Sequence, residues 1–75
     1  MKKRVDNIIS LGKIIRQARK YQKLTQDDLS GLTGLGLRFI SEVENGKETA
    51  QIGKVLLILS TLGIRLDAEA EWMDD

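Results

Sequence analysis

The stretch Leu24–Lys47, LTQDDLSGLTGLGLRFISEVENGK, has the pattern of two short helices joined by a glycine turn. Thr25 suits the N-cap of the first helix, and Asp28, three residues later, completes a short-armed capping box. Gly34 ends this helix, because glycine accepts the left-handed conformation at a helix C-terminus. The residues expected to face inward from it are Leu29 and Leu32.

The second helix is expected over Leu37–Asn45, before Gly46. At about 100° per residue, Phe39, Ile40 and Val43 share one face that can pack on a core. The opposite face carries three polar side chains within about 60° of one another, Arg38, Ser41 and Asn45. A basic, hydroxyl and amide set of this kind contacts base edges and phosphates in DNA. An ordinary solvated helix face is the alternative interpretation.

The flanking segments predict further helices. Upstream, Ser10 is the expected N-cap of a helix that reaches about Gln22 and carries an apolar stripe on one side. Its other faces carry basic residues that are interpreted as a solvated face rather than a defined site: Lys13, Arg16, Arg19 and Lys20. Downstream, residues 51–62 read as a helix that is apolar over more than one face. In so short a chain, the second apolar face indicates contact with another subunit. The candidate interface residues of this helix are Leu56 and Leu59.

The C-terminal segment changes to the period of a strand. From Ile64 to Trp72, apolar and charged side chains alternate. A lone strand cannot satisfy its backbone groups, so we expect a two-stranded ribbon with a second subunit, through Ile64, Leu66 and Ala68. An irregular or helical tail is the alternative, because Ala and Glu favour helix. Trp72 is interpreted as a dimer plug, as an anchor for a protein partner, or as a loose residue.

The 75 residues indicate one domain in three parts: a flexible basic N-terminus (1–9), a helix-turn-helix domain (10–63), and a dimerisation strand with an acidic tail (64–75). The net charge of +1 hides an asymmetry. Residues 1–25 hold eight basic side chains and one acidic, whereas residues 67–75 hold five acidic and no basic ones. The basic front, which includes Arg16, is expected to lie on phosphates. The alternative is that the two charged ends only keep the protein soluble.

The composition excludes several classes of function. The chain has no cysteine and no histidine, which excludes disulfides, thiolate metal sites and histidine-based catalysis. No phosphate-cradling glycine loop follows a strand, so neither an enzyme nor a cofactor is expected. The apolar runs are too short to span a membrane, and the basic N-terminus lacks a signal peptide's apolar stretch, which fits a cytoplasmic protein.

The stretch Leu24–Lys47 resembles the helix-turn-helix of the lambda-repressor-like (XRE/Cro-type) family, over roughly residues 10–63. The features that carry the resemblance are Leu24-Thr25-Gln26, Leu29-Ser30, Gly34, Ile40, Val43 and Glu44-Asn45-Gly46-Lys47. More narrowly, LGKIIRQARK, RFISEVENGK and KVLLILSTLGIRL are similar to HipB-type antitoxins. The resemblance implies a compact all-α domain of four to five helices with a short C-terminal β-strand that pairs across a dimer. It also implies a bacterial, nucleoid-associated repressor that binds its own operator, an inverted repeat, and a HipA-type kinase toxin.

The resemblance assigns DNA-binding roles to matching positions. Gln26 would bond a phosphate or brace the recognition helix (residues 36–45). The groove-facing positions are Leu37, Arg38 and Ser41. Asn45 and Lys47 would contact the DNA backbone.

Two departures from the family pattern affect these roles. Gly36 stands where the family usually has a capping serine or threonine, and Leu37 stands where a polar residue is common. Leucine contacts only thymine methyls or deoxyribose, so Arg38 is the residue we expect to read a base. Glu42 borders the polar face and is expected to pair with a nearby basic side chain or to hold Arg38 in place. The alternative is that it accepts a hydrogen bond from a cytosine amine. A protein-interaction module on a helix-turn-helix scaffold, with weak or lost DNA binding, is the alternative function.

Overall fold

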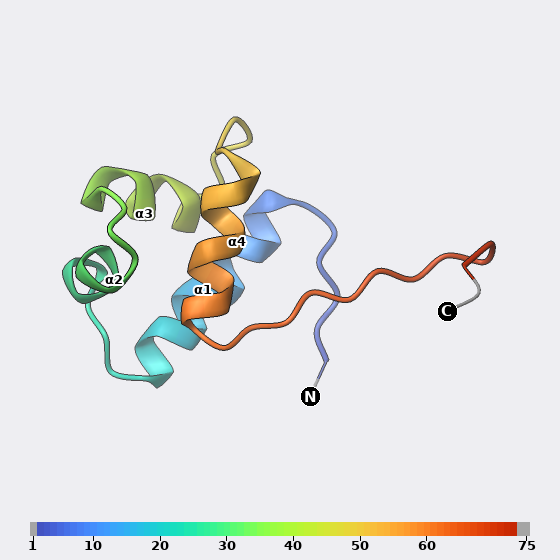
Figure 1. The fold of residues 1–75 in the computed structure, drawn as a ribbon, viewed down its shortest axis with the longest axis horizontal. Coiled ribbons are helices and arrows are strands. Elements are labelled where there is room, and N and C mark those ends of the chain that lie inside the picture. The colour runs from blue at the N-terminus through green and yellow to red at the C-terminus, as the bar shows by residue number, and fades with distance from the viewer. Residues whose placement is uncertain (1, 74–75) are drawn as a thin grey trace.

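The computed structural model describes residues 2–73, which contain four helices and no strand. The helices are α1 (Ile8–Tyr21), α2 (Gln26–Thr33), α3 (Leu37–Glu44) and α4 (Ile52–Thr61). α2 and α3 lie to one side of α1 and α4, and both ends of the chain leave from the opposite side (Figure 1). The predicted all-α helix-turn-helix fold is confirmed. None of the helices within residues 2–73 is both long and apolar enough to cross a membrane.

α1 begins three residues earlier than the position implied by a Ser10 N-cap. Asn7 is the N-cap: its side-chain oxygen accepts from the backbone N–H of Ser10 at 2.9 Å, and the Ser10 hydroxyl accepts from the N–H of Asn7 at 3.2 Å. This reciprocal pair satisfies two free donors at once, which neither residue does alone. Ser10 is therefore the third helical residue, and residues 8–9 of the predicted flexible segment are helical.

The limits of α2 are those expected from the sequence. Thr25 and Asp28 form the capping box, with the Thr25 hydroxyl 2.9 Å from the Asp28 nitrogen and the Asp28 carboxylate 2.8 Å from the Thr25 nitrogen. Gly34 ends the helix in the left-handed conformation, at φ 76°. The turn into α3 is fixed by Leu35, whose N–H donates to the Thr33 hydroxyl and whose carbonyl accepts from the Ser30 hydroxyl.

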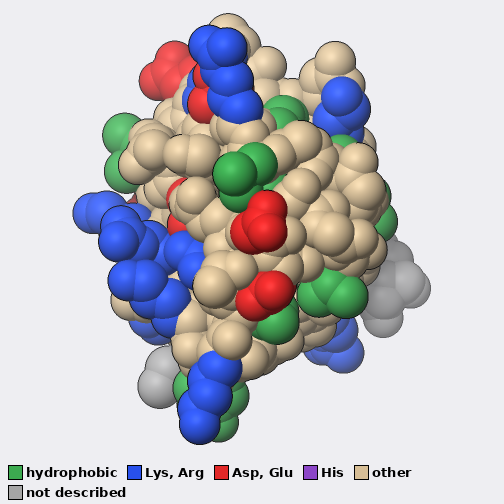
Figure 2. Space-filling model, turned by 90° about the vertical axis from the view of Figure 1, so that its left-hand side faces the viewer, with side chains coloured by type: hydrophobic (Ala, Val, Ile, Leu, Met, Phe, Trp, Pro, Cys, Tyr) green, Lys and Arg blue, Asp and Glu red, His purple; other side chains and the backbone are tan. Residues whose placement is uncertain are grey.

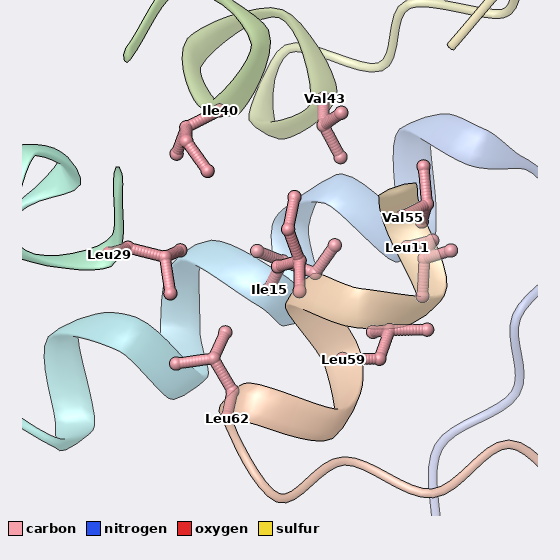
Figure 3. Close-up of a cluster of buried hydrophobic side chains, with 9 residues drawn as sticks. Leu11, Ile15, Leu29, Ile40, Val43, Val55, Leu59 and Leu62 are labelled. Atoms are coloured by element: carbon pink, nitrogen blue, oxygen red, sulfur yellow. The ribbon is translucent and has the colours of Figure 1, made fainter. Parts of the chain in front are cut away.

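The core lies where α1, α3 and α4 meet, with α2 closing one side (Figure 3). Its buried members are Leu11, Ile15, Leu29, Ile40, Val43, Val55, Ile58, Leu59 and Leu62. Ile40 and Val43 point from α3 toward Ile15 of α1, which confirms the predicted inward face of the second helix. Full burial of a side chain of this size stabilises a fold by about 1.5–3 kcal/mol, so these contacts fix the position of α3.

Two leucines lie elsewhere than predicted. Leu32 is 62% exposed, because the short α2 turns only its Leu29 side to the core. Leu59 is 2% exposed and belongs to the core of its own chain, so it offers no surface to another subunit. Leu56, its neighbour on α4, is 46% exposed and keeps the place predicted for an interface residue.

Gly12 marks the closest approach of two helices. A Cβ added to Gly12 would lie 2.4 Å from the carbonyl oxygen of Val43 and 2.9 Å from that of Glu44. The end of α3 therefore rests directly on the backbone of α1. Gly31 of α2, by contrast, has open space around it, because an added Cβ would meet nothing within 4 Å.

The C-terminal segment leaves the core as an extended chain. Ile64 is half-buried, packs against the core and donates its N–H to the carbonyl of Leu59 at 2.8 Å. The following residues run away from the body of the molecule (Figure 1) and form no strand within the described chain. The predicted intersubunit strand requires a second chain and stays a prediction.

Candidate nucleic-acid interface

The outer face of α3 presents the side chains predicted to contact DNA. The Arg38 side chain is 91% exposed, and Leu37 beside it is 47% exposed. Asn45, at the C-cap, is exposed, and Ser41 is half-buried. Figure 2 looks onto the side of the molecule formed by α2 and α3, where basic side chains gather along the borders and separate hydrophobic and acidic side chains lie between them. The surface can therefore offer both charged and apolar contacts.

Glu42 connects the two basic residues of this face. Its Oε2 lies 3.6 Å from Nε of Arg38, one helical turn away, and 3.1 Å from Nζ of Lys47. The expectation that Glu42 pairs with a neighbouring basic side chain is confirmed. An exposed pair of this kind contributes little to stability, but it holds both cations beside the outer face of α3.

A buried ion pair anchors the end of α3 to α1. The guanidinium of Arg19 donates to both carboxylate oxygens of Glu44, at 2.6 and 3.0 Å. The amide nitrogen of Gln26 donates to the same carboxylate at 3.1 Å, and Arg19 also donates to the carbonyl of Leu24 at 2.8 Å. Gln26 therefore takes the bracing role of the two that were expected for it.

Sequence reasoning placed Arg19 on a solvated basic face, and this was wrong, since its side chain is 9% exposed. A signal was present in the sequence. Arg19 follows Leu11 and Ile15 at intervals of four residues, and so lies on the apolar stripe of α1. A charged residue on such a stripe is buried only with a partner, and Glu44 is that partner.

The environment of Glu44 keeps it ionised. Burial of the carboxyl raises its pKa, but the hydrogen bonds from Arg19 and Gln26 and the charges of Arg19 and Arg16 outweigh burial and lower the pKa below its ordinary value. The pKa of Arg19 is raised, chiefly by its hydrogen bond to Glu44, so both groups stay charged. The effect of Arg16 also shows that this exposed side chain lies near the C-terminal end of α3.

The basic front divides into parts with different places in the molecule. Arg19 is buried against Glu44, and Arg16 lies near α3. Lys3 donates to the side chain of Gln17 at 2.9 Å, so residues 2–5 fold back along α1. They lie on the side from which the chain ends emerge (Figure 1). The basic side chains of this front therefore do not share one surface, and contact of the front with phosphates stays a prediction.

The candidate residues form two groups. Glu42 lies within ion-pair distance of both Arg38 and Lys47. Glu44 accepts from Gln26, and the charge of Arg16 lowers the pKa of Glu44. With Leu37, Ser41 and Asn45, these residues make the proposed DNA face. Trp72, 79% exposed, lies in the projecting tail with Leu66 and Ala68, which are also exposed.

The chain is similar to known helix-turn-helix proteins. Residues 12–69 match the protein family described as "Helix-turn-helix domain". Over 67 residues the chain is 52% identical to the "Uncharacterized HTH-type transcriptional regulator y4mF" of Sinorhizobium fredii (strain NBRC 101917 / NGR234), covering 89% of this chain and 88% of that protein.

Solved structures share the fold. A chain of the HipA-HipB-O2-O3 complex superposes with a TM-score of 0.84 at 18% identity, over 93% of this chain and 99% of the other. The restriction-modification controller protein C.AhdI from Aeromonas hydrophila gives a TM-score of 0.69 at 26% identity, over 77% of this chain and 88% of the other. The first likeness, at 18% identity, shows the fold alone.

Proposed function

The chain belongs to the helix-turn-helix family of DNA-binding transcriptional regulators, and we propose that it is a dimeric, sequence-specific repressor that reads its operator through α3. The observation that carries this proposal is the two-sided character of α3. Ile40 and Val43 seat the helix in the core, while Arg38 extends into solvent with 91% of its side chain exposed. An α-helix with its side chains is about 10–12 Å in diameter, so α3 fits into a major groove about 12 Å wide.

Arg38 is the residue proposed to read a base. Its guanidinium presents two parallel donors, which match the O6 and N7 acceptors of guanine in the major groove. Ser41, one turn further along the same face, can donate to or accept from a neighbouring base. Leu37 has no polar atom beyond its backbone and is proposed to contact a thymine methyl.

Phosphate contacts are proposed for the residues that surround α3. Lys47 and Asn45 follow its C-terminal end, and Arg16 lies near that end from α1. Gln26 uses its amide nitrogen on Glu44, so any phosphate contact of Gln26 would compete with the bracing bond. Contacts of this class supply most of the affinity and fix the register, whereas base contacts supply specificity.

Two subunits would place two α3 helices in successive major grooves. Half-sites would then be about 34 Å apart, one turn of the duplex, and the operator would be an inverted repeat. Support for a dimer comes from the exposed apolar side chains of Leu56 and Leu57 on α4 and of Leu66 in the tail. The regulator would act on DNA in the bacterial cytoplasm.

The narrower proposal is a HipB-type antitoxin that also binds a HipA-type kinase toxin. It is supported by the resemblance of three sequence segments and by the shared fold with a chain of the HipA-HipB-O2-O3 complex. The exposure of Trp72 suits contact with another protein chain. A purified kinase toxin of this type, titrated with the protein in a pull-down, tests this part separately from DNA binding.

Leu37 favours one competing function. A leucine that is 47% exposed at the start of the outer face of α3 suits a protein partner as well as DNA. A scaffold that binds protein and has lost operator recognition would show weak DNA binding without sequence preference. Phosphate binding, by contrast, weakens steeply with salt.

Selection from a randomised duplex pool tests the proposed function. The purified chain is expected to enrich an inverted repeat with half-sites one helical turn apart. Repeating the selection with Arg38→Ala is expected to relax the preference at one base position in each half-site. Failure of the wild-type chain to enrich any consensus would overturn the repressor proposal in favour of the protein-interaction scaffold.

A further inference from the structure

A small pocket of about 160 Å³ lies at the border of the proposed DNA face, where α3 meets the first turn of α4. Glu42 and Lys47, which belong to that face, form one side of the pocket. The other side is formed by Phe39, the residue after Arg38, and by Lys54 of α4. The pocket therefore joins the recognition helix to a basic side chain that lies outside the residues of the DNA face.

The ring of Phe39 holds the ammonium group of Lys54 beside this pocket. Nζ of Lys54 lies 5.6 Å from the centroid of the ring, within the range of a cation–π contact. Phe39 is partly buried and packs against the core, so its ring is a fixed support. A lysine in solvent moves among many rotamers, and this contact favours those that keep the charge beside α3.

The charges around the pocket leave an excess of positive charge. Oε2 of Glu42 lies 3.1 Å from Nζ of Lys47 and 3.6 Å from Nε of Arg38, so one carboxylate serves two cations. Within residues 2–73, no acidic side chain forms an ion pair with Lys54. Three basic groups thus surround a single acidic one, and such an excess attracts an anion.

Backbone hydrogen bonds fix the loop that closes the pocket. The N–H of Lys47 donates to the carbonyl of Glu42 at 3.0 Å, and the N–H of Ala50 donates to the carbonyl of Lys47 at 3.3 Å. The N–H of Lys54 donates to the carbonyl of Gln51 at 3.1 Å, at the start of α4. Both lysines are therefore carried by backbone that is already in place to receive a ligand.

We propose that this pocket binds one phosphate group of the DNA backbone in each half-site, with Lys54 as the contact residue and Phe39 as the residue that positions it. The inference rests on the DNA binding of the proposed function and extends the phosphate contacts from α3 to α4. Because Phe39 limits the motion of Lys54, less side-chain entropy is lost when the phosphate binds. A phosphate contact of this kind adds affinity and fixes the register but reads no base.

Anisotropy with the selected operator duplex, over a series of salt concentrations, tests the contact. Lys54→Gln is expected to weaken binding to operator and unrelated duplexes by a similar factor, with the selected consensus unchanged. The slope of log K against log [salt] is expected to become shallower by about 0.9, the value for one phosphate. Lys54→Arg is expected to keep the wild-type slope. The matched control, Arg65→Gln, removes an exposed cation of the tail, away from α3 (Figure 1), and is expected to keep the wild-type affinity and slope.

A double-mutant cycle separates the positioning role of Phe39 from its packing. Phe39→Leu keeps an apolar side chain against the core but removes the ring. It is expected to weaken operator binding about two- to fivefold in the wild-type background, and to have no further effect in the Lys54→Gln background. An equal loss in both backgrounds would show a purely structural effect and would overturn the role of Phe39.

Neutral methylphosphonates, placed one at a time in the operator, identify the phosphate that is bound. One position in each half-site is expected to cost the wild-type chain affinity and to cost Lys54→Gln none. Inorganic phosphate, exchanged for chloride at equal ionic strength, is expected to affect both proteins alike. A loss of affinity in wild type alone, without a methylphosphonate position that depends on Lys54, would assign the pocket to free phosphate and overturn the DNA contact.

The remaining outcomes separate this inference from the proposed function. Equal salt slopes and equal methylphosphonate profiles for wild type and Lys54→Gln, with an operator still selected by wild type, would overturn the inference and leave the repressor standing. A wild-type chain that binds no duplex would overturn both.

Discussion

Two residue contacts on α1 set the position of the recognition helix. Gly12 admits the carbonyl oxygens at the end of α3 where any side chain would collide with them. Two turns further along α1, Arg19 holds the carboxylate of Glu44 in a bidentate pair. The first contact is steric and the second is ionic, so different substitutions disrupt them.

Gly12→Ala tests the steric contact. A methyl group placed 2.4 Å from a backbone oxygen forces α1 and α3 apart, and overpacking of this kind costs about 1–3 kcal/mol. In a domain of this size, the melting temperature is expected to fall by about 4–8 °C for each kcal/mol of lost stability, as thermal unfolding would measure.

Gly31→Ala is the matched control, because the same added methyl group meets open space in α2. Alanine there is expected to stabilise the protein by about 0.5–1 kcal/mol. A Gly12→Ala protein as stable as the Gly31→Ala protein would contradict the close approach of α1 and α3.

The ionic contact predicts a dependence of stability on pH. The pKa of Glu44 is lower in the folded protein than in the unfolded chain. The contribution of the Glu44 carboxylate to the free energy of unfolding is therefore complete above the ordinary glutamate pKa of about 4.3. It is lost as the pH falls through the lower pKa of the folded protein. At pH 7, Glu44→Gln is expected to lower the free energy of unfolding by about 3 kcal/mol, because it leaves Arg19 buried without a charged partner.

Urea denaturation at pH 7, 5, 4 and 3 checks this. The difference in the free energy of unfolding between wild type and Glu44→Gln is expected to shrink as the pH falls. The exposed control, Glu48→Gln, is expected to keep the free energy of unfolding of wild type at every pH. A gap that stays constant to pH 3 would show that the Glu44 carboxylate is not stabilised by folding.

At the scale of the element, α3 combines a fixed inner side with an outer side of opposing charges. Arg38 and Lys47 attract phosphate, and Glu42 between them repels it. A carboxylate on a DNA-facing helix lowers binding to any duplex, and it also holds Arg38 in one orientation. Its presence is expected to favour specificity over raw affinity.

Glu42→Gln tests this balance. Removal of the negative charge is expected to raise affinity for non-specific duplex DNA several-fold, since Arg38 and Lys47 are released toward phosphates. The ratio of operator to non-specific affinity is expected to fall. Titration of both duplexes at one salt concentration measures this ratio, and an unchanged non-specific affinity would mean that Glu42 lies outside the interface.

The same element shows what the sequence could and could not predict. Period and capping residues are local signals, so they placed α2, α3 and the polar face of α3 within a residue or so. Arg19 and Glu44 are far apart in sequence, and only packing brings them together. Leu59 was wrongly predicted as an interface residue, because a helix that is apolar on most sides does not show which side faces its own chain.

At the scale of the whole molecule, charged side chains lie on two opposite sides. The proposed DNA face lies on the side of α2 and α3, and the basic N-terminal arm (residues 2–5) and the acidic tail lie on the other (Figure 1). The net charge of +1 therefore describes neither face. In the proposed dimer, such a division would leave both recognition helices free to contact DNA.

The most direct test of the central claim is fluorescence anisotropy with the selected duplex, at two salt concentrations, for wild type, Arg38→Ala and Arg65→Ala. Arg65 is a matched control, an exposed arginine in the tail. The account predicts that Arg38→Ala weakens binding by about 1–3 kcal/mol and loses discrimination at one base position, while Arg65→Ala binds like wild type. Equal, small losses for both variants, with no change in base preference, would contradict the claim that α3 reads DNA.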